Sequence, residues 1–179
     1  MKRFGRLALV AALALTVTAC DSDSPSAPSS NPTVVILSAN LTPGNEVPPV
    51  TNADANARGT VRVTLDITRD GSGTITGGSA SFFITLTGFP AGTQLTGAHI
   101  HPGAAGVNGG VQVNTGLNAS TAGNPLATGA GTFIFNAITA GVTPAIIQQL
   151  MDNPAGFYFN VHTTLNLGGA VRGQLQRDL

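Results

Sequence analysis

The strongest constraint on the fold is the alternation of apolar and polar side chains from Thr60 to Thr68. Val61, Val63, Leu65 and Ile67 take every second position, and polar side chains fill the positions between them. Because successive side chains point to opposite faces of a strand, this pattern predicts a half-buried antiparallel strand. The Asp-Gly-Ser-Gly sequence at residues 70–73 predicts a tight hairpin turn directly after it.

Apolar and β-branched segments separated by glycine or proline recur along the chain and predict the other strands. These lie at Thr33–Leu37, Ser79–Thr87, Gln94–His101, Gly110–Val113, Gly129–Ile138, Gly156–Thr163 and Ala170–Leu175, with a bulge or bend at residues 77–78 and a proline-rich loop at residues 41–50. One helix is expected at Thr143–Asn153, with Thr143 as its N-cap. The expected fold class is all-β: an antiparallel Greek-key β-sandwich or flattened barrel of about eight strands with one short helix.

The first residues carry the features of a secretory signal. A short basic start precedes an apolar run at residues 7–17, which is too short to span a bilayer. The run ends in Val17-Thr18-Ala19-Cys20, which resembles a bacterial lipobox with Cys20 as the lipidated first mature residue. The alternative is an ordinary cleaved signal peptide with an incidental cysteine.

The expected domain organisation follows from this signal. Residues 1–19 are the lipoprotein signal peptide, residues 20–32 are the lipidated Cys20 and a flexible Ser/Pro-rich tether, and residues 33–179 are one domain. The expected partner of Cys20 is membrane lipid, and the expected location is the bacterial cell envelope, on its periplasmic or surface side. Inner and outer membrane are not distinguished by the sequence.

Charge and cysteine content exclude several classes of protein. The whole chain has 8 cationic and 8 anionic side chains, and removing residues 1–19 takes away three of the cations. A mature domain without a basic surplus is not expected to bind nucleic acid. The single cysteine excludes a disulfide scaffold. No Ser-His-Asp order, phosphate loop or nucleotide fingerprint is present, so the sequence favours a protein that is not an enzyme.

The chemistry of the sequence concentrates in three histidines. His99 and His101 are two residues apart on one predicted strand, so both imidazoles share a face. His162 lies on another predicted strand and also points away from the expected core. If the strands are neighbours, the three imidazoles form a metal site suited to Cu²⁺ above Zn²⁺. Affinity is then expected to fall below about pH 6. The alternative is separate histidines that each hydrogen-bond to a backbone carbonyl or to Asn160.

Four segments, in order, resemble the CHRD domain, the module named after chordin. They are Asn45-Glu46-Val47-Pro48-Pro49-Val50, Ala98-His99-Ile100-His101-Pro102-Gly103, Tyr158-Phe159-Asn160-Val161-His162-Thr163 and Ala170-Val171-Arg172-Gly173-Gln174-Leu175. CHRD domains occur in growth-factor-binding animal chordins and in bacterial secreted proteins or lipoproteins. The resemblance implies a β-rich extracellular module and fixes no activity for the bacterial members.

A weaker resemblance links the histidines to the β-sandwich of Cu/Zn superoxide dismutase. It implies that His99, His101 and His162 are copper ligands and that Arg172 guides anions. The chain has no further histidine for a bridging imidazolate and no cysteine pair, which excludes a Cu/Zn enzyme and leaves a copper-only relative as the alternative.

Glu46, Asn160 and Arg172 are expected around the histidines. Glu46, the one glutamate of the chain, is expected either to accept a histidine N–H or to bond backbone N–H groups of its own loop. Arg172 either guides anions or pairs with Glu46 or Asp66.

Two function hypotheses follow. The first is a membrane-tethered, non-catalytic binding or structural module with a three-histidine metal site and an unidentified protein or envelope partner. The second is a copper-binding protein with a storage, delivery or dismutase-like redox role.

Overall fold

Two antiparallel sheets make up the domain in the computed structural model, which describes residues 33–118 and 126–178. The predicted signal peptide, Cys20 and tether lie outside the described residues and stay predictions. Within the described residues, the strands are β1 (Val34–Leu41), β2 (Arg58–Arg69), β3 (Ile75–Thr87), β4 (Leu95–Pro102), β5 (Val113–Asn114), β6 (Gly131–Ile138), β7 (Phe157–Thr163), β8 (Val171–Gln174) and β9 (Gln176–Arg177). Helix α1 spans Pro144–Asp152, and short 3-10 turns lie at Pro43–Asn45, Ala53–Asn56 and Pro154–Gly156.

The five-stranded sheet has the order β6-β3-β2-β1-β9 and follows the predicted alternation. In β2, Val61, Val63, Leu65 and Ile67 are buried. The β2–β3 hairpin closes through Asp70, whose side chain accepts hydrogen bonds from the backbone of Ser72 and Thr74. The Ser72 hydroxyl also donates to Asp70, and its bond, followed by the backbone bonds, holds the Asp70 pKa below its usual value. The register shifts where Thr68 pairs with Gly77 and Arg69 pairs with Ile75, next to the predicted bend.

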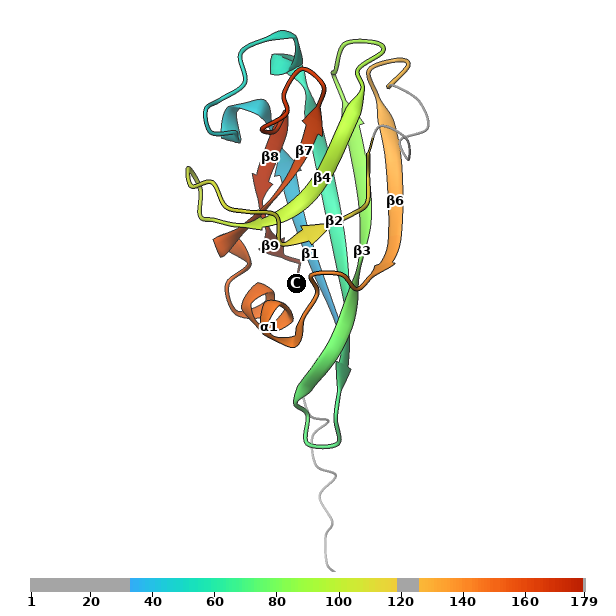
Figure 1. Cartoon of the computed structure of the whole chain (residues 1–179), viewed down its shortest axis with the longest axis vertical. Helices are drawn as coiled ribbons and strands as arrows, with labels where there is room; N and C mark the ends of the chain where they lie inside the picture. The colour runs from blue at the N-terminus through green and yellow to red at the C-terminus, as the bar shows by residue number, and fades with distance from the viewer. Residues whose placement is uncertain (1–32, 119–125, 179) are drawn as a thin grey trace, which may run out of the picture. The chain divides into compact units, whose positions relative to one another are not determined.

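The four-stranded sheet has the order β5-β4-β7-β8 and packs face to face with the first sheet (Figure 1). The chain passes from one sheet to the other after β3, β5, β6 and β8. Between the sheets, the rings of Phe82 and Phe159 lie 5.8 Å apart. Helix α1 begins at the predicted N-cap, Thr143, and adds Ile147 and Leu150 to the core. The all-β sandwich predicted from the sequence is confirmed.

Two strand predictions differ from the structure. The strand expected at Gly110–Val113 is shortened and shifted to Val113–Asn114, although the Gln112 N–H still donates to the Ile100 carbonyl of β4. The chain before Gln112 is held over the outer face of the four-stranded sheet by hydrogen bonds from Arg172 to the carbonyls of Ala104 and Val107. A ninth strand, β9, pairs with Leu37 and Ser38 of β1 and was not expected. Both are two-residue strands, too short for a periodic sequence pattern.

The outer face of the four-stranded sheet is buried, unlike that of the first sheet. His101, Tyr158, Asn160 and Arg172 all point away from the core and are still between 1% and 5% exposed. We name the segment at residues 103–112 the cover loop, because Arg172 and Tyr158 hydrogen-bond to it. Polar side chains that the sequence places outside the core are therefore held in a second, polar interior.

Candidate metal centre

The register between β4 and β7 brings the three histidines together. His99 pairs with Asn160, His101 with Tyr158 and Gly97 with His162. His162 is therefore one diagonal step from His99 on the same face of the sheet. The sequence establishes that His99 and His101 share a face, and the β4–β7 pairing supplies the adjacency that a shared site needs.

The three imidazoles lie within contact of one another. The ring centres are 4.8 Å apart for His99 and His162, 5.5 Å for His99 and His101, and 6.2 Å for His101 and His162. One ring nitrogen from each histidine lies within 4.8 Å of the other two. The predicted clustering of His99, His101 and His162 is confirmed.

Backbone carbonyls fix which nitrogen of two of these rings carries the proton. His101 Nδ1 lies 3.0 Å from the Gly109 carbonyl oxygen, and His162 Nδ1 lies 2.8 Å from the Leu167 carbonyl oxygen. A carbonyl oxygen only accepts, so both Nδ1 atoms donate and both Nε2 atoms keep a lone pair. His101 Nε2 is buried and has no hydrogen-bond partner. Metal-ligating histidines are oriented in this way, by a hydrogen bond from the nitrogen that does not bind the metal.

His99 completes the cluster from the neighbouring strand. Its Nδ1 lies 3.0 Å from His162 Nε2, so in the absence of metal Nδ1–H donates to that nitrogen. Gly97 makes room for the ring, because a Cβ at this position would lie 2.7 Å from His99 Cε1. A glycine two residues before the first histidine is thus required by packing.

Burial keeps all three imidazoles neutral at neutral pH. Desolvation and the two neighbouring histidines lower the pKa of His99 to about 4. Desolvation also lowers the pKa values of His101 and His162, although hydrogen bonds to backbone carbonyls partly oppose it. Neutral imidazole is the form that binds metal. We therefore expect protons to compete with a metal ion only below the pH 6 expected from an unperturbed histidine.

Arg172 and Tyr158 hold the cover loop in place. Arg172 donates to the carbonyls of Ala104 and Val107 at 3.1 and 2.7 Å and to the Asn108 side chain at 2.9 Å. The Arg172 Cζ lies 3.3 Å from the centre of the Tyr158 ring. Tyr158 in turn stacks on the His101 ring, with the two ring centres 4.8 Å apart. The Gly109 carbonyl of the same loop accepts the hydrogen bond from His101 Nδ1–H. By holding the loop, Arg172 therefore orients His101 indirectly. Its anion-guiding role stays a prediction.

Glu46 is buried beside the loop that follows β7. It is 5% exposed, its Oε1 has no hydrogen-bond partner, and a Cβ on Gly169 would collide with its carboxyl group. Burial raises the Glu46 pKa to about 7, and the positive charge of Arg172 opposes that rise. One alternative was that Glu46 accepts a hydrogen bond from a histidine, but the Nδ1–H groups of His101 and His162 donate to the carbonyls of Gly109 and Leu167.

The donor set fits a small transition-metal ion. Metal–nitrogen bonds of about 2.0–2.1 Å place two ligating nitrogens about 3–4 Å apart, depending on the angle at the metal. The 3.0 Å between His99 Nδ1 and His162 Nε2 meets this requirement. The three ligating nitrogens lie up to 4.8 Å apart, so one ring must move inward only slightly to bring every pair within about 3–4 Å. Three imidazoles suit Zn²⁺ or Cu²⁺, and Cu²⁺ binds nitrogen ligands more tightly.

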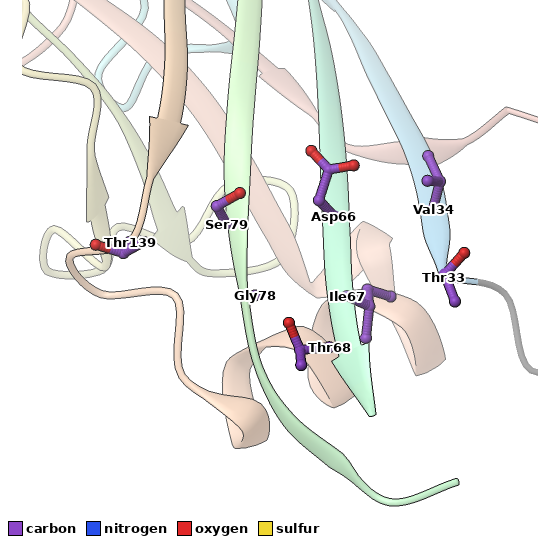
Figure 2. A pocket seen from close by; sticks show the side chains of 8 residues that line it. All are labelled: Thr33, Val34, Asp66, Ile67, Thr68, Gly78, Ser79 and Thr139. Carbon is purple, nitrogen blue, oxygen red and sulfur yellow. The ribbon is translucent and has the colours of Figure 1, made fainter. Parts of the chain in front are cut away.

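A surface hollow of about 470 Å³ lies away from the histidines, on the outer face of β1, β2 and β3. Figure 2 shows its lining residues, among them Val34, Asp66 and Ser79 in one cross-strand row. Asp66 is its one ionisable side chain. Because no second acid, base or metal ligand lines this hollow, it offers no counterpart to the histidine cluster.

Two elements of the site were not foreseen from the sequence. One is the Tyr158 ring, sandwiched by contacts with His101 and Arg172. The other is the identity of the two backbone carbonyls, at Gly109 and Leu167, that set the tautomers, because hydrogen bonds to carbonyls or to Asn160 were expected only if the histidines lay apart. Backbone acceptors carry no residue-type signal. The signal that was available is the glycine-rich composition of both segments, which lets a loop lie close against a sheet.

Comparison with known proteins identifies the family. No helix among the described residues is long and apolar enough to cross a membrane. No curated protein and no solved structure matches the chain significantly. The family model described as the CHRD domain matches residues 37–175, which include all three histidines and every strand except β9 and the start of β1. The chain therefore belongs to the CHRD domain family.

Proposed function

We propose that this protein is a membrane-tethered, extracytoplasmic CHRD module that binds one metal ion through His99, His101 and His162. In this proposal the module is a non-catalytic binding protein, and Cys20 carries the lipid that holds it at the envelope. The tether rests on the sequence features of residues 1–32, and the metal site rests on the geometry of the four-stranded sheet.

One observation carries the metal-binding proposal. Buried His101 and half-buried His162 turn their Nε2 lone pairs toward the same small space, and only the one on His101 has no hydrogen-bond partner. His99 Nδ1 lies 3.0 Å from His162 Nε2. Leaving a buried polar atom such as His101 Nε2 without a partner costs roughly 1–3 kcal/mol. A bound cation removes that cost, whereas three purely structural histidines would retain it.

Copper is the metal that the donor set favours. Three neutral imidazoles supply nitrogen ligands and no thiolate, and affinity for such ligands rises to Cu²⁺ and falls again at Zn²⁺. Zn²⁺ is the second choice, because it accepts the same ligands in tetrahedral geometry.

Isothermal titration of the purified protein with Cu²⁺ and Zn²⁺ tests the metal site. The full chain is used with Cys20→Ser, so that no thiol competes for the ion. We expect one ion per chain, with Cu²⁺ bound more tightly than Zn²⁺. His101→Gln and His162→Gln each remove one ligand and should weaken binding at least about 100-fold.

A matched control separates a built site from the presence of surface histidine. Phe83→His places a lone imidazole on the exposed outer face of β3, where Phe83 is 46% exposed. This variant should add no tight site. Equal binding by the wild type and the two histidine variants would contradict the proposal.

Fractionation of cells tests the tether. The wild-type chain should partition with membranes, and it should incorporate label from a fatty-acid precursor. Cys20→Ser removes the acylated thiol and should release the protein or leave it unprocessed. Membrane association that is unchanged in this variant would contradict a lipid anchor.

A redox role is the second candidate function, favoured by the position of the ligands. His99 and His162 are only partly buried, so one side of the cluster lies near solvent and is open to a small molecule. A copper-loaded protein that consumes superoxide at a rate above free Cu²⁺, with loss of the rate in His162→Gln, would select this role over a non-catalytic one.

A further inference from the structure

Asn160 occupies the centre of the histidine cluster. It lies in the middle of β7, pairs across the sheet with His99 on one side and with Arg172 on the other, and is 2% exposed. His162 is two residues further along the same strand, so the two side chains share a face. The Asn160 side chain is therefore surrounded by the residues that form the candidate metal site.

The Asn160 oxygen faces an atom that has no proton to give. Asn160 Oδ1 lies 3.0 Å from His162 Nε2, at hydrogen-bond distance. The proton of the His162 ring is on Nδ1, where it is donated to the Leu167 carbonyl. Two acceptor atoms in contact inside a buried site repel each other, and a cation between or beside them removes that repulsion.

We propose that Asn160 Oδ1 is the fourth protein ligand of the metal ion. This inference rests on the three-histidine site proposed above and adds an amide oxygen to its three nitrogens. Carbonyl oxygens of asparagine are established metal ligands, and a mixed set of nitrogen and oxygen donors in four-coordinate geometry is typical of Cu²⁺. All four ligands are neutral, so the ion keeps its full charge inside the site.

The chemical consequence is that the protein closes the coordination sphere. A three-histidine site normally retains a position for water or substrate. An amide oxygen in that position excludes equatorial water, and a site without an open position suits holding or transferring an ion better than activating a small molecule on it. The Asn160 ligand therefore favours the binding role over the redox role.

The competing interpretation is that Asn160 only orients His162. If the amide is turned by half a rotation, its N–H₂ group donates to His162 Nε2, and the two orientations are distinguished by the hydrogen-bond network alone. Asn160 would then be a positioning residue. Loss of such an orienting group also costs about 10–100-fold in metal affinity, so affinity by itself does not separate the two roles.

Electron spin-echo measurements of the Cu²⁺-loaded full chain in D₂O separate them. This method detects exchangeable deuterons of water bound directly to copper. We expect three coupled imidazoles and no equatorial water in the wild type, equatorial water in Asn160→Ala, and none in Asn160→Asp. We also expect Cu²⁺ affinity about tenfold or more weaker in Asn160→Ala and about tenfold tighter in Asn160→Asp, because a carboxylate oxygen replaces the amide oxygen.

Asn114→Ala is the matched control. Asn114 pairs with His99 from the other side, on β5, but it is exposed and its Oδ1 accepts the Gly116 N–H. This variant should retain wild-type affinity and no equatorial water. Unfolding of each metal-free variant by urea checks that the fold is retained.

The outcomes distinguish the two proposals. If the wild type binds Cu²⁺ through three imidazoles and already holds equatorial water, Asn160 is not a ligand and only this inference is wrong. The wild-type spectrum decides this even if Asn160→Ala fails to fold. If the wild type binds no copper, or binds it without imidazole coupling, the proposed function fails as well.

Discussion

The outer faces of the two sheets have similar sequence patterns, but one face lies in solvent and the other is buried. On the five-stranded sheet, the outward side chains of β2 alternate with the core residues and lie in solvent, as Arg62 does. On the four-stranded sheet, the outward side chains of β7 include Tyr158 and Asn160, which are as buried as the core. One face is an ordinary surface, and the other is an interior made of polar groups.

The difference lies in the loops and not in the strands. The cover loop is held onto the four-stranded sheet by Arg172, and the segment after β7 is held by the contact between Leu167 and His162. Among residues 33–118 and 126–178, nothing comparable covers Phe83 or Ile134 on the other sheet, which are 46% and 61% exposed. A covered polar face costs free energy unless its groups are satisfied, which is why the unsatisfied His101 Nε2 points to a ligand.

Removal of a core side chain sets the scale for the comparison. Phe159 faces inward from β7, is fully buried and contacts the Phe82 ring. Phe159→Ala should lower the free energy of unfolding by about 3–5 kcal/mol. Phe83→Ala, on the exposed face, should lower it by less than about 1 kcal/mol. Urea unfolding measures both, and a loss below about 1 kcal/mol for Phe159→Ala would mean that the inner and outer faces of β7 are reversed.

Two arginines test whether the outer faces differ as described. Arg172→Ala removes three hydrogen bonds from a charged donor and a contact with the Tyr158 ring, and should cost about 2–4 kcal/mol. Arg62→Ala, on the exposed face, should change stability by less than about 0.5 kcal/mol. Arg172→Lys should not rescue, because lysine lacks the planar fork. Equal effects of the two alanine variants in urea unfolding would remove the distinction between the faces.

The buried carboxyl group of Glu46 should make the free energy of unfolding depend on pH. Its pKa is raised to about 7 in the folded protein against 4.5 for the exposed group, so its contribution to stability is full below pH 4.5 and is lost as pH rises through 7. Glu46→Gln cannot ionise and should be about 1–3 kcal/mol more stable than the wild type at pH 8, with little difference at pH 4.5. The histidines titrate with the opposite sign, and comparing the two proteins at each pH cancels their contribution.

A Glu46→Gln variant that is less stable than the wild type at pH 8 would indicate that the carboxylate is ionised and stabilised by Arg172. Unfolding in urea at pH 4.5, 6 and 8 is the measurement.

The smallest expected effect is the response of metal affinity to acid. Three unperturbed imidazoles at pH 5.5 would lose affinity by about 10³-fold to protons. Because burial lowers all three histidine pKa values, and that of His99 to about 4, we expect a loss within about tenfold between pH 7.5 and 5.5. Titration at both pH values measures it, and a 10³-fold loss would mean that the rings are solvated and the face is open.

The sequence predicts the strands better than it predicts what covers them. Alternation located β2, the turn residues located the hairpin, and Thr143 marked the start of α1, because each depends on local periodicity or capping. The shared face of His99 and His101 follows from the same rule. The β4–β7 adjacency entered through the family resemblance, since strand pairing is non-local.

The burial of the site could not be predicted in the same way. Whether Tyr158 and Asn160 lie in solvent depends on where a glycine-rich loop folds, and the loop is held by backbone carbonyls that any residue provides. The same holds for the tautomers of His101 and His162. The sequence therefore indicated the ligands of the site, and the structure shows how they are oriented.

The central claim is that the outer face of the four-stranded sheet is a prebuilt site for one metal ion, and nitrogen NMR of the imidazole rings tests it most directly. Without metal, long-range ¹⁵N–¹H spectra should show His101 and His162 as the Nδ1–H tautomer at pH 7, held by Gly109 and Leu167. One equivalent of Zn²⁺ should shift the Nε2 signals of both and one nitrogen of His99, and further equivalents should shift nothing more. Rings that exchange between tautomers without metal, or that keep their nitrogen shifts when Zn²⁺ is added, would contradict the account.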